Sequence, residues 1–382
     1  MTRKPGDTSA SCYFFNSKFF TFSVIAAGLV LSGCASVNAQ FNPAKPHHTP
    51  EGFKNNYTTS VTKSRSDFFR WQYQRLLDDL PKAPLTPTPV VAPDVTFVQS
   101  NAKAPNMQPA ITWVGHATML VQANGLNVLT DPIFSERASP IQSVGPKRAH
   151  PPGLSMEQLP PIDVVLISHN HYDHLDKHSV LALFNRAQGA TLFIVPLGVK
   201  ALFDDLGIQN VKELDWWDSV NVKGVEFNFT PVQHWSARGL GDRSQTLWGG
   251  WAVFGPATHW YFSGDTGYSQ DFLDTQKRFA ARQTPAKGGG FDLALIAVGA
   301  YEPRWFMKEQ HVNPAEAVQI HQDLKAKRSV GVHWGTFSLT DESLDQPPKD
   351  LAAALRERGL APDVFTVMAI GETRVLPARQ AP

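Results

Sequence analysis

Apolar runs alternate with stretches of helical periodicity from about residue 110 to near the end of the chain. The runs at 164–168 and 192–195 are short and continuous, which is typical of buried strands, and 177–186 between them has helical spacing. Further strands are expected at 111–114, 118–122, 126–130, 225–232, 250–254, 260–263, 293–298 and 329–333, and further helices near 198–206, 271–281, 314–325 and 349–358. Asn124-Gly125 predicts a tight hairpin, because both turn positions need positive φ. Strands that alternate with helices predict an α/β domain with its helices outside.

The beginning of the chain has the pattern of an export signal. Basic residues precede an apolar run at 19–31, which ends in Leu31-Ser32-Gly33-Cys34. At 1.5 Å per residue this run is too short to cross about 30 Å of hydrocarbon. It has the length of a signal-peptide core. An ordinary secretory signal and a poorly aligned membrane anchor are the alternatives.

Leu31-Ser32-Gly33-Cys34 resembles the lipobox of bacterial lipoproteins, in which the cysteine is acylated and becomes the mature N-terminus. The resemblance implies a signal peptide over 1–33, lipidation at Cys34 and a lipid-anchored protein of the bacterial cell envelope. Ala35, in place of aspartate, favours the outer membrane, with the protein facing the periplasm. Acyl chains contribute about 0.8 kcal/mol per buried CH₂, so several of them would hold the protein firmly to a bilayer.

Two segments between this signal and the main domain lack the pattern of a packed core. Residues 34–65 are polar and proline-containing, which predicts a tether away from the membrane. Residues 66–109 are expected to form a helix at 66–80 followed by a proline-rich linker. A single catalytic domain is therefore expected over 110–382.

Composition excludes several classes of protein. The 382 residues include 42% hydrophobic and 18% charged residues with a net charge of +1, so the chain can bury a core and is not disordered. This balance offers no global basic field for phosphate backbones, and nucleic acid is not expected as a partner. The two cysteines are Cys12 and Cys34, so the main domain has no disulfide, cysteine-ligated zinc or cysteine nucleophile.

Titratable residues crowd the chain directly after the strand at 164–168, where six positions include His169, His171, Asp173 and His174. Such groups are costly to bury unless they pair or bind metal. Single polar residues also stand directly beyond later strands: His234, Asp265 and His333. A solvated histidine-rich loop and, at Asp265, ordinary turn chemistry are the alternatives. Together the seven residues provide two sets of three and one shared carboxylate, which predicts a site for two metal ions.

This ligand pattern resembles that of the metallo-β-lactamase superfamily. Longer strings resemble more closely the phospholipases D that hydrolyse N-acylphosphatidylethanolamine: Leu129-Thr130-Asp131-Pro132-Ile133-Phe134, Gly145-Pro146-Lys147-Arg148, Gln233-His234-Trp235, Ser263-Gly264-Asp265-Thr266-Gly267-Tyr268, Gly299-Ala300-Tyr301-Glu302-Pro303-Arg304-Trp305-Phe306-Met307 and His333-Trp334-Gly335-Thr336-Phe337. The resemblance covers about residues 71–348. The leader and the tail beyond 348 depart from the family.

The resemblance implies a four-layer αββα sandwich with two zinc ions at one edge. One zinc would be bound by His169, His171 and His234, and the other by Asp173, His174 and His333, while Asp265 bridges them. Imidazole and carboxylate ligands suit Zn²⁺, and iron or manganese use the same ligand types.

The resemblance also implies hydrolysis of a membrane phospholipid. A hydroxide that bridges the zinc ions would attack phosphorus, so that N-acylphosphatidylethanolamine, or a related glycerophospholipid, yields an N-acylethanolamine and phosphatidic acid. The expected catalytic residues are Asp173, Asp265 and His311. His311 is the candidate that protonates the leaving alkoxide, and a metal-bound water or a water held by Gln310 are its rivals.

Substrate contacts are expected from residues close to the ligands in the sequence: Trp235, Tyr268, Trp305, Phe306 and Gln310. The alternative for the aromatic residues is a place in the core. Asp131 and His116 could support the zinc ligands or could be purely structural.

Two other functions are compatible with the same residues. One is a metallo-β-lactamase-fold lactonase or soluble phosphodiesterase, and the other is an envelope lipoprotein that holds zinc without catalysis. A structural zinc site fills its coordination with protein ligands, whereas three residues and a shared carboxylate leave a position for water, which favours catalysis. Protein partners cannot be inferred from the sequence.

Overall fold

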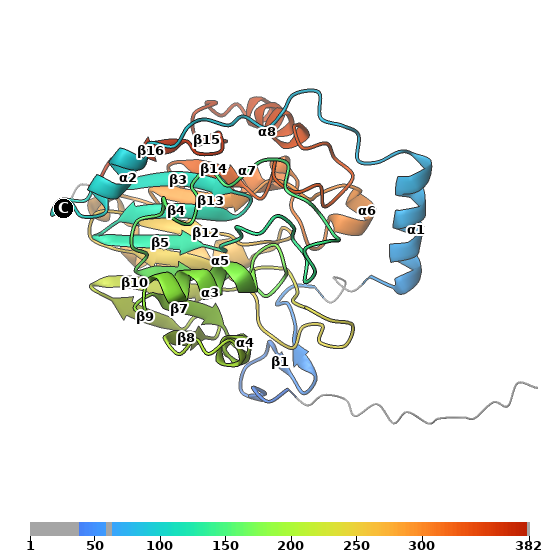
Figure 1. The fold of residues 1–382 in the computed structure, drawn as a ribbon, viewed down its shortest axis with the longest axis horizontal. Helices are drawn as coiled ribbons and strands as arrows, with labels where there is room; N and C mark the ends of the chain where they lie inside the picture. Colours follow the sequence, from blue (N-terminus) through green and yellow to red (C-terminus); the bar gives the residue numbers. More distant parts are fainter. Residues whose placement is uncertain (1–37, 59–62, 380–382) are drawn as a thin grey trace, which may run out of the picture. The chain divides into compact units, whose positions relative to one another are not determined.

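The computed structural model describes residues 38–58 and 63–379. The expected signal peptide and Cys34 lie outside these residues. Two seven-stranded β-sheets with flanking helices make up most of what is described (Figure 1). No helix within these two ranges is long and apolar enough to cross a bilayer.

The first sheet has the strand order β16-β3-β4-β5-β6-β7-β8. Its strands pair antiparallel as far as β5 and parallel from β5 onward. They are β3 (Ala110–Gly115), β4 (Thr118–Ala123), β5 (Leu126–Thr130), β6 (Val164–Leu166), β7 (Leu192–Pro196), β8 (Val211–Leu214) and β16 (Thr373–Val375). The hairpin predicted at Asn124-Gly125 is confirmed, because it joins β4 to β5 with φ of 58° and 76° at its two turn residues.

The second sheet has the order β15-β14-β13-β12-β11-β10-β9. It comprises β9 (Ser219–Val222), β10 (Val225–Thr230), β11 (Gly250–Phe254), β12 (His259–Phe262), β13 (Leu293–Ala297), β14 (Ser329–Val332) and β15 (Phe365–Thr366). Because β10 and β12 both pair antiparallel with β11, they run in the same direction, as do β13 and β14. The C-terminal ends of these four strands therefore lie at the same edge of the sheet.

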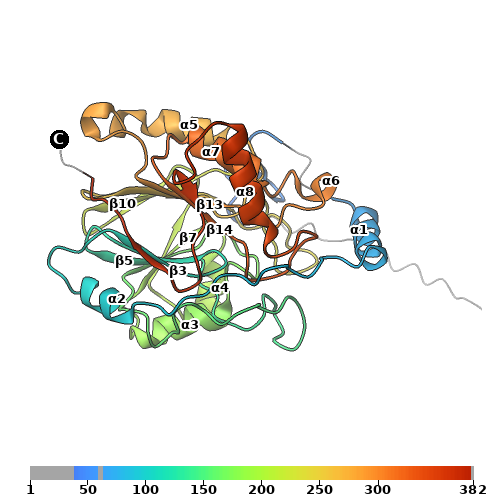
Figure 2. The same cartoon turned by 90° about the horizontal axis from the view of Figure 1, so that it is seen from above.

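Helices cover the outer face of each sheet, as Figure 2 shows. Those beside the first sheet are α2 (Val95–Asn101), α3 (Lys177–Arg186) and α4 (Lys200–Asp205), and those beside the second are α5 (Asp271–Phe279), α7 (Pro314–Asp323) and α8 (Gln346–Glu357). Alternate strand residues serve the two sides of the first sheet: Val121 and Val128 join the core between the sheets, while Leu120 and Leu129 pack with residues of α3. The predicted four-layer αββα sandwich is confirmed.

The shortest elements escaped the sequence analysis. These are the strands β8, β9, β15 and β16 and the helices α2 and α6 (Arg304–Met307). Such short segments contain too few residues to show a period. The longer elements lie close to their expected positions, including the N-terminal helix α1 (Arg65–Leu77).

Residues 38–58 differ from the tether expected over 34–65. They include a two-stranded sheet of β1 (His48–Thr49) and β2 (Gly52–Phe53), and the Phe53 side chain is buried in the core cluster between the large sheets. His47 and His48 are also buried. Polar side chains attach this segment to the rest of the domain through hydrogen bonds. Such contacts produce no apolar period in the sequence, so the pattern could not predict them.

Candidate metal centre

The seven predicted ligands meet at the edge of the sandwich where the parallel strands end. The loop after β6 carries four of them, and the segments beyond β10, β12 and β14 carry the others: His234, Asp265 and His333. Five of the seven are buried, while His171 and Asp173 are partly accessible. His333 has a φ of 63°, so the chain turns sharply immediately after β14.

Three imidazoles form the first ligand group: His169, His171 and His234. His171 Nδ1 lies 2.8 Å from His169 Nε2 and 3.3 Å from His234 Nε2. His169 Nδ1 donates to Ser168 Oγ, whose own proton goes to a carboxylate, and His234 Nδ1 donates to the carbonyl oxygen of Gln310. A neutral imidazole has one proton, so His169 Nε2 and His234 Nε2 point lone pairs towards His171.

The second ligand group combines imidazoles with a carboxylate: Asp173, His174 and His333. Asp173 Oδ2 lies 3.3 Å from His174 Nε2 and 3.2 Å from His333 Nε2. The Asp265 carboxylate lies 3.1 Å and 3.2 Å from the same two nitrogens. Asp265 Oδ2 is also 3.9 Å from the Nε2 atoms of His169 and His234 in the first group. Asp265 therefore lies between the two groups.

These spacings fit metal ions. Tetrahedral Zn²⁺ with bonds of about 2.0–2.1 Å to nitrogen holds neighbouring ligand atoms about 3.3 Å apart. Within the groups the corresponding distances run from 2.8 to 3.3 Å. Asp265 Oδ1 and His174 Nε2 are buried and have no hydrogen-bond partner among the described residues. Buried polar atoms of this kind are costly without a partner, so the residues present fit a metal centre.

The imidazoles of the first group have lowered pKa values, which favours the form that binds metal. Burial lowers the pKa of His171 and of His234 to about 3, and it lowers the pKa of His169 well below its ordinary value. All three rings are therefore neutral at physiological pH, and a neutral imidazole is the form that binds metal.

The ionised side chains of the centre belong to the second group and to Asp265. Burial lowers the pKa of His333, but the negative charge of Asp265 and the hydrogen bond to Asp173 outweigh it and raise the pKa to about 9. Burial raises the pKa of both carboxyl groups, but the charge of His174 outweighs it and keeps both values well below their usual range. The two carboxylates are therefore ionised, as oxygen ligands of a cation must be.

Asp131 supports both groups from behind. It is fully buried, and its Oδ2 accepts hydrogen bonds from His174 Nδ1 at 2.7 Å and from Ser168 Oγ at 2.5 Å. Its Oδ1 accepts from the Ser168 backbone N–H at 2.7 Å. A carboxylate behind a histidine fixes the tautomer and the orientation of a metal ligand. Of the two interpretations of Asp131 that the sequence allowed, the contacts favour the supporting one.

His116 also contacts the second group. Its Nε2 lies 3.0 Å from Asp173 Oδ2, and its backbone carbonyl accepts the His333 N–H at 3.0 Å. Burial lowers the pKa of His116 to about 3, so its ring is neutral and can donate one N–H to Asp173. The sequence allowed a supporting or a purely structural role for His116. Its contacts with two predicted ligands favour the supporting one.

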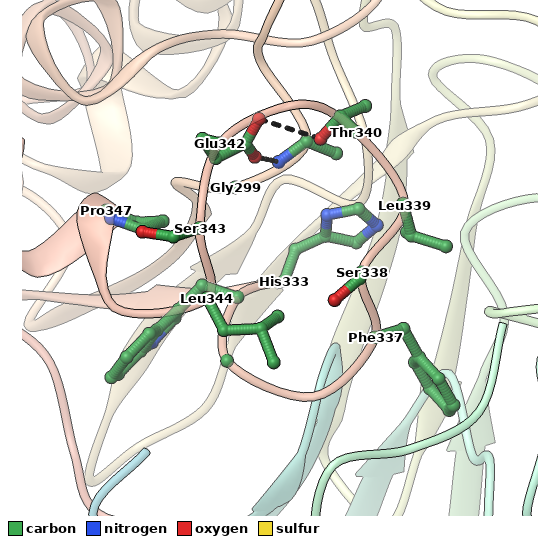
Figure 3. Close-up of a pocket in the computed structure, with 13 residues that line it drawn as sticks. Gly299, His333, Phe337, Ser338, Leu339, Thr340, Glu342, Ser343, Leu344 and Pro347 are labelled. Atoms are coloured by element: carbon green, nitrogen blue, oxygen red, sulfur yellow. Dashed lines mark hydrogen bonds between the residues drawn. The ribbon is translucent and has the colours of Figure 1, made fainter. Parts of the chain in front are cut away.

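A hydrogen-bonded loop surrounds the His333 ring. Figure 3 shows the loop of residues 337–344 around the ring, with Glu342 close to Thr340. The Glu342 carboxylate accepts hydrogen bonds from the Ala300 N–H at 2.6 Å and from Thr340 Oγ1 at 2.8 Å. The space inside the loop is only about 10 Å³, which is too small for a substrate.

A separate cavity of about 790 Å³ also reaches the centre, and its lining includes His171, Asp173 and Asp265. The apolar part of the lining includes Phe68, Phe69, Trp71, Leu240, Phe306 and Met307. Three cationic side chains also line it: Lys63, Arg65 and Arg243. The contribution of α1 to this wall was missed by the sequence analysis, because no motif connects that helix to the ligands.

The expected substrate contacts divide into two sets. Trp235, Phe306, Gln310 and His311 line the large cavity. Trp305 and Tyr268 do not, so these two expectations are corrected. The Trp305 ring is 39% exposed beneath the Arg70 guanidinium, and the Tyr268 hydroxyl donates to Asp323 at 2.7 Å. Neighbourhood in the sequence does not fix the direction in which a side chain points.

His311 stands at the edge of the ligand groups. Its Nδ1 lies 3.8 Å from Asp265 Oδ2 and has no hydrogen-bond partner among the described residues. Burial lowers its pKa to about 3, so the ring is neutral in the free protein.

Residues 126–334 match the family model of the β-lactamase superfamily domain, which amounts to more than half of the chain. The chain belongs to this superfamily. It is a metal-dependent hydrolase of the metallo-β-lactamase fold.

Two relatives of this hydrolase are named for the same activity. It is 40% identical over 272 residues to N-acyl-phosphatidylethanolamine-hydrolyzing phospholipase D 1 of Caenorhabditis elegans. The aligned residues cover 68% of this chain and 74% of the relative. It is 37% identical over 250 residues to the mitochondrial N-acyl-phosphatidylethanolamine-hydrolyzing phospholipase D of Saccharomyces cerevisiae. Here the aligned residues cover 63% of this chain and 50% of the relative. These identities support the predicted resemblance.

A solved structure has a similar fold. The isothiocyanate hydrolase from Delia radicum gut bacteria superposes with a TM-score of 0.56 at 21% identity, covering 70% of this chain and 99% of the other. At this identity the comparison shows the fold alone.

Proposed function

We propose that this hydrolase is a zinc-dependent phosphodiesterase of the phospholipase D type. Its substrate would be N-acylphosphatidylethanolamine or a related glycerophospholipid, and its products an N-acylethanolamine and phosphatidic acid. The observation that carries the proposal is the position of two ligand groups, joined by Asp265, beside an apolar cavity of about 790 Å³. The two relatives with this activity in their names support it.

The ligand groups determine where the chemistry takes place. His169, His171 and His234 would hold one zinc ion, Asp173, His174 and His333 the other, and Asp265 both. When bound, two such ions supply a strong nucleophile from water at neutral pH and neutralise the charge of the phosphate oxygens. In the reaction, the water oxygen forms a bond to phosphorus, the bond from phosphorus to the head-group oxygen breaks, and that oxygen takes up a proton.

His311 is the protein group placed to contact the reacting phosphate. It lines the cavity and has an unpartnered ring nitrogen close to Asp265. We assign it a hydrogen bond to the phosphate or to the leaving oxygen, with Gln310 beside it in the lining. His311→Gln, which keeps an N–H donor, should therefore lose less of kcat than His311→Phe, for which we expect a loss of about 10²-fold.

The cavity suits a lipid with a charged phosphate. Its apolar wall can accept acyl chains, because the side chains of α1 and α6 provide surface that would otherwise face water. Lys63, Arg65 and Arg243 can pair with the phosphodiester charge. On α1, Phe69 is 68% exposed and Leu76 is 80% exposed, which suits contact with a membrane that contains the substrate.

An assay with mixed micelles tests the proposed reaction. Purified protein without residues 1–33 is incubated with N-acylphosphatidylethanolamine, with a lactone and with a soluble phosphodiester, and the products are identified by mass spectrometry. We expect N-acylethanolamine and phosphatidic acid, and their formation should stop in a chelator and recover with zinc. Turnover of the lactone or the soluble diester alone would contradict the lipid assignment. A failure to turn over any of the three would contradict the proposed catalysis.

We also propose that the protein is a lipid-anchored protein of the bacterial cell envelope, attached through Cys34 to the outer membrane on its periplasmic side. The lipobox-like sequence before Cys34 supports this proposal. Cys34→Ser is expected to move the protein from the membrane fraction to the soluble fraction after cell breakage. An unchanged distribution would contradict lipidation at Cys34.

A further inference from the structure

The N-terminal segment of residues 38–58 is fastened to the domain by a cluster around Asp215. Asp215 Oδ1 pairs with His47 Nε2 at 2.7 Å, and its Oδ2 pairs with Lys45 Nζ at 2.6 Å and with His48 Nε2 at 2.9 Å. The His47 ring also stacks on Trp216, with centroids 4.5 Å apart. The ammonium group and the two imidazoles already satisfy the carboxylate, so this cluster is explained as an attachment point.

Beyond this attachment, the segment reaches the metal centre through Asn55. The Asn55 Nδ2 group donates to the carbonyl oxygen of His234 at 2.9 Å, and the His234 backbone N–H donates to Asn55 Oδ1 at 3.0 Å. Trp248 Nε1 also donates to Asn55 Oδ1, at 3.1 Å. One side-chain amide thus binds both backbone groups of a predicted ligand, as a neighbouring strand would.

His234 needs such a partner because of its place in the chain. It lies beyond the end of β10, and Asn55 makes the only hydrogen bonds to its backbone among the described residues. The backbones of other ligands are held within the domain: the His333 N–H donates to His116, and the His174 N–H donates to His171. The His234 ring is fixed separately, by its hydrogen bond to the Gln310 carbonyl.

We propose that Asn55 is a positioning residue for the ligand His234, and that the N-terminal segment thereby completes the metal centre. Asn55 acts through His234 and is not among the residues that line the cavity. Loss of its amide releases the His234 backbone, so the ring no longer meets His169 and His171 at a fixed point. The inference rests on the proposed centre of two metal ions and adds a contribution from outside the main domain.

The neighbouring residue provides a matched control. Asn56 belongs to the same segment, but its Nδ2 donates to Asp271 Oδ1 at 2.7 Å, at the start of α5. Asn56→Leu therefore removes a single attachment of the same segment without touching a ligand. Asn55→Leu removes all three hydrogen bonds of Asn55, whereas Asn55→Asp keeps an acceptor for the His234 N–H and for Trp248.

The test measures zinc affinity by competition with a chelator, together with the melting temperature of the metal-free proteins. We expect Asn55→Leu to bind one of its two zinc ions 10- to 100-fold more weakly, in line with the usual effect of losing a partner of a ligand. Asn55→Asp should lie between it and the unmodified protein, and Asn56→Leu should bind both ions normally. The melting temperature should fall more in Asn55→Leu, which loses three hydrogen bonds, than in Asn56→Leu, which loses one.

Three results would overturn the inference. Unchanged zinc affinity in Asn55→Leu would show that His234 does not depend on Asn55. Equal weakening in Asn55→Leu and Asn56→Leu, with equal loss of melting temperature, would show a purely structural role of the segment. If the unmodified protein binds fewer than two zinc ions, the proposed centre fails, and this inference fails with it.

Discussion

The two ligand groups of the metal centre become ready for a cation in opposite ways. In the group of His169, His171 and His234, burial and, to a smaller extent, the neighbouring imidazoles lower the pKa values, so the rings are neutral without any ion. In the group that contains His333, carboxylates raise the imidazole pKa, to about 9 for this residue. A metal ion must displace protons from the second group but not from the first. Metal binding to the second group alone should therefore be coupled to proton release.

The two groups also differ in what holds them in place. A carboxylate inside the domain, Asp131, orients His174 at 2.7 Å. The backbone of His234 is held by Asn55, which lies 179 positions earlier in the chain. The second group can therefore form within the domain, whereas the first also depends on the N-terminal segment. Substitutions at Asp265, Asp131 and Asp215 separate these dependencies.

The largest effect is expected from Asp265→Ala, because Asp265 contacts both groups. Loss of the shared carboxylate should weaken both metal ions and lower kcat by about 10³-fold or more, which corresponds to several kcal/mol of transition-state stabilisation. Elemental analysis and the lipid assay measure the two effects. Two bound metal ions with activity within tenfold of the unmodified protein would show that Asp265 is not shared.

An intermediate effect is expected from Asp131→Asn, which replaces the charged partner of His174 Nδ1 with a neutral one. Asp131 contacts His174 directly and reaches His169 only through Ser168, so we expect about 10- to 100-fold weaker binding of the metal ion in the second group and a smaller effect on the other ion. Chelator competition with the two ions resolved is the measurement, and Asn55→Leu, which should affect the other ion, is its counterpart. Equal weakening of both ions by Asp131→Asn would contradict the separation of the two supports.

The smallest effect on the centre is expected from Asp215→Asn, which loosens the N-terminal segment without touching a ligand. Burial raises the pKa of Asp215, but hydrogen bonds from His47 and Lys45 outweigh it and hold the pKa well below its ordinary value. Its contribution to stability is therefore present above about pH 3.9, the value in the unfolded chain, and is lost as the pH falls below that.

Denaturant unfolding of the metal-free proteins measures this contribution. At pH 7 we expect Asp215→Asn to lower the free energy of unfolding by about 2 kcal/mol. The difference from the unmodified protein should shrink as the pH falls below about 3.9. An equal difference at neutral and acidic pH would show that the charge of Asp215 does not matter.

The sequence alone was enough to predict the fold, through its apolar pattern and its resemblance to the metallo-β-lactamase superfamily. It was also enough to identify the seven candidate ligands. Each of His169, His234, Asp265 and His333 stands after an apolar run, and runs of this kind form strands whose ends meet at one edge. The apolar pattern shows where each strand ends in the sequence, and the parallel arrangement of the strands brings the residues at these ends together.

Asp131 and His116 were recognised as candidate supports, but Asn55 and the wall formed by α1 could not be predicted in the same way. Asn55 lies in a polar segment without a period, and its partner is the backbone of His234, which leaves no trace in the sequence. The apolar side chains of α1 look like an ordinary helix face until the cavity shows what they enclose. Tyr268 was assigned to the substrate because its motif neighbours are ligands, but its hydroxyl reaches Asp323.

The most direct test of the account is a stepwise titration of the metal-free protein with zinc, while turnover of N-acylphosphatidylethanolamine is followed. A centre that needs both ligand groups predicts little turnover up to one zinc ion per chain and full turnover at two. Full turnover at one ion or fewer, or undiminished turnover in the metal-free protein, would contradict a reaction that depends on two metal ions.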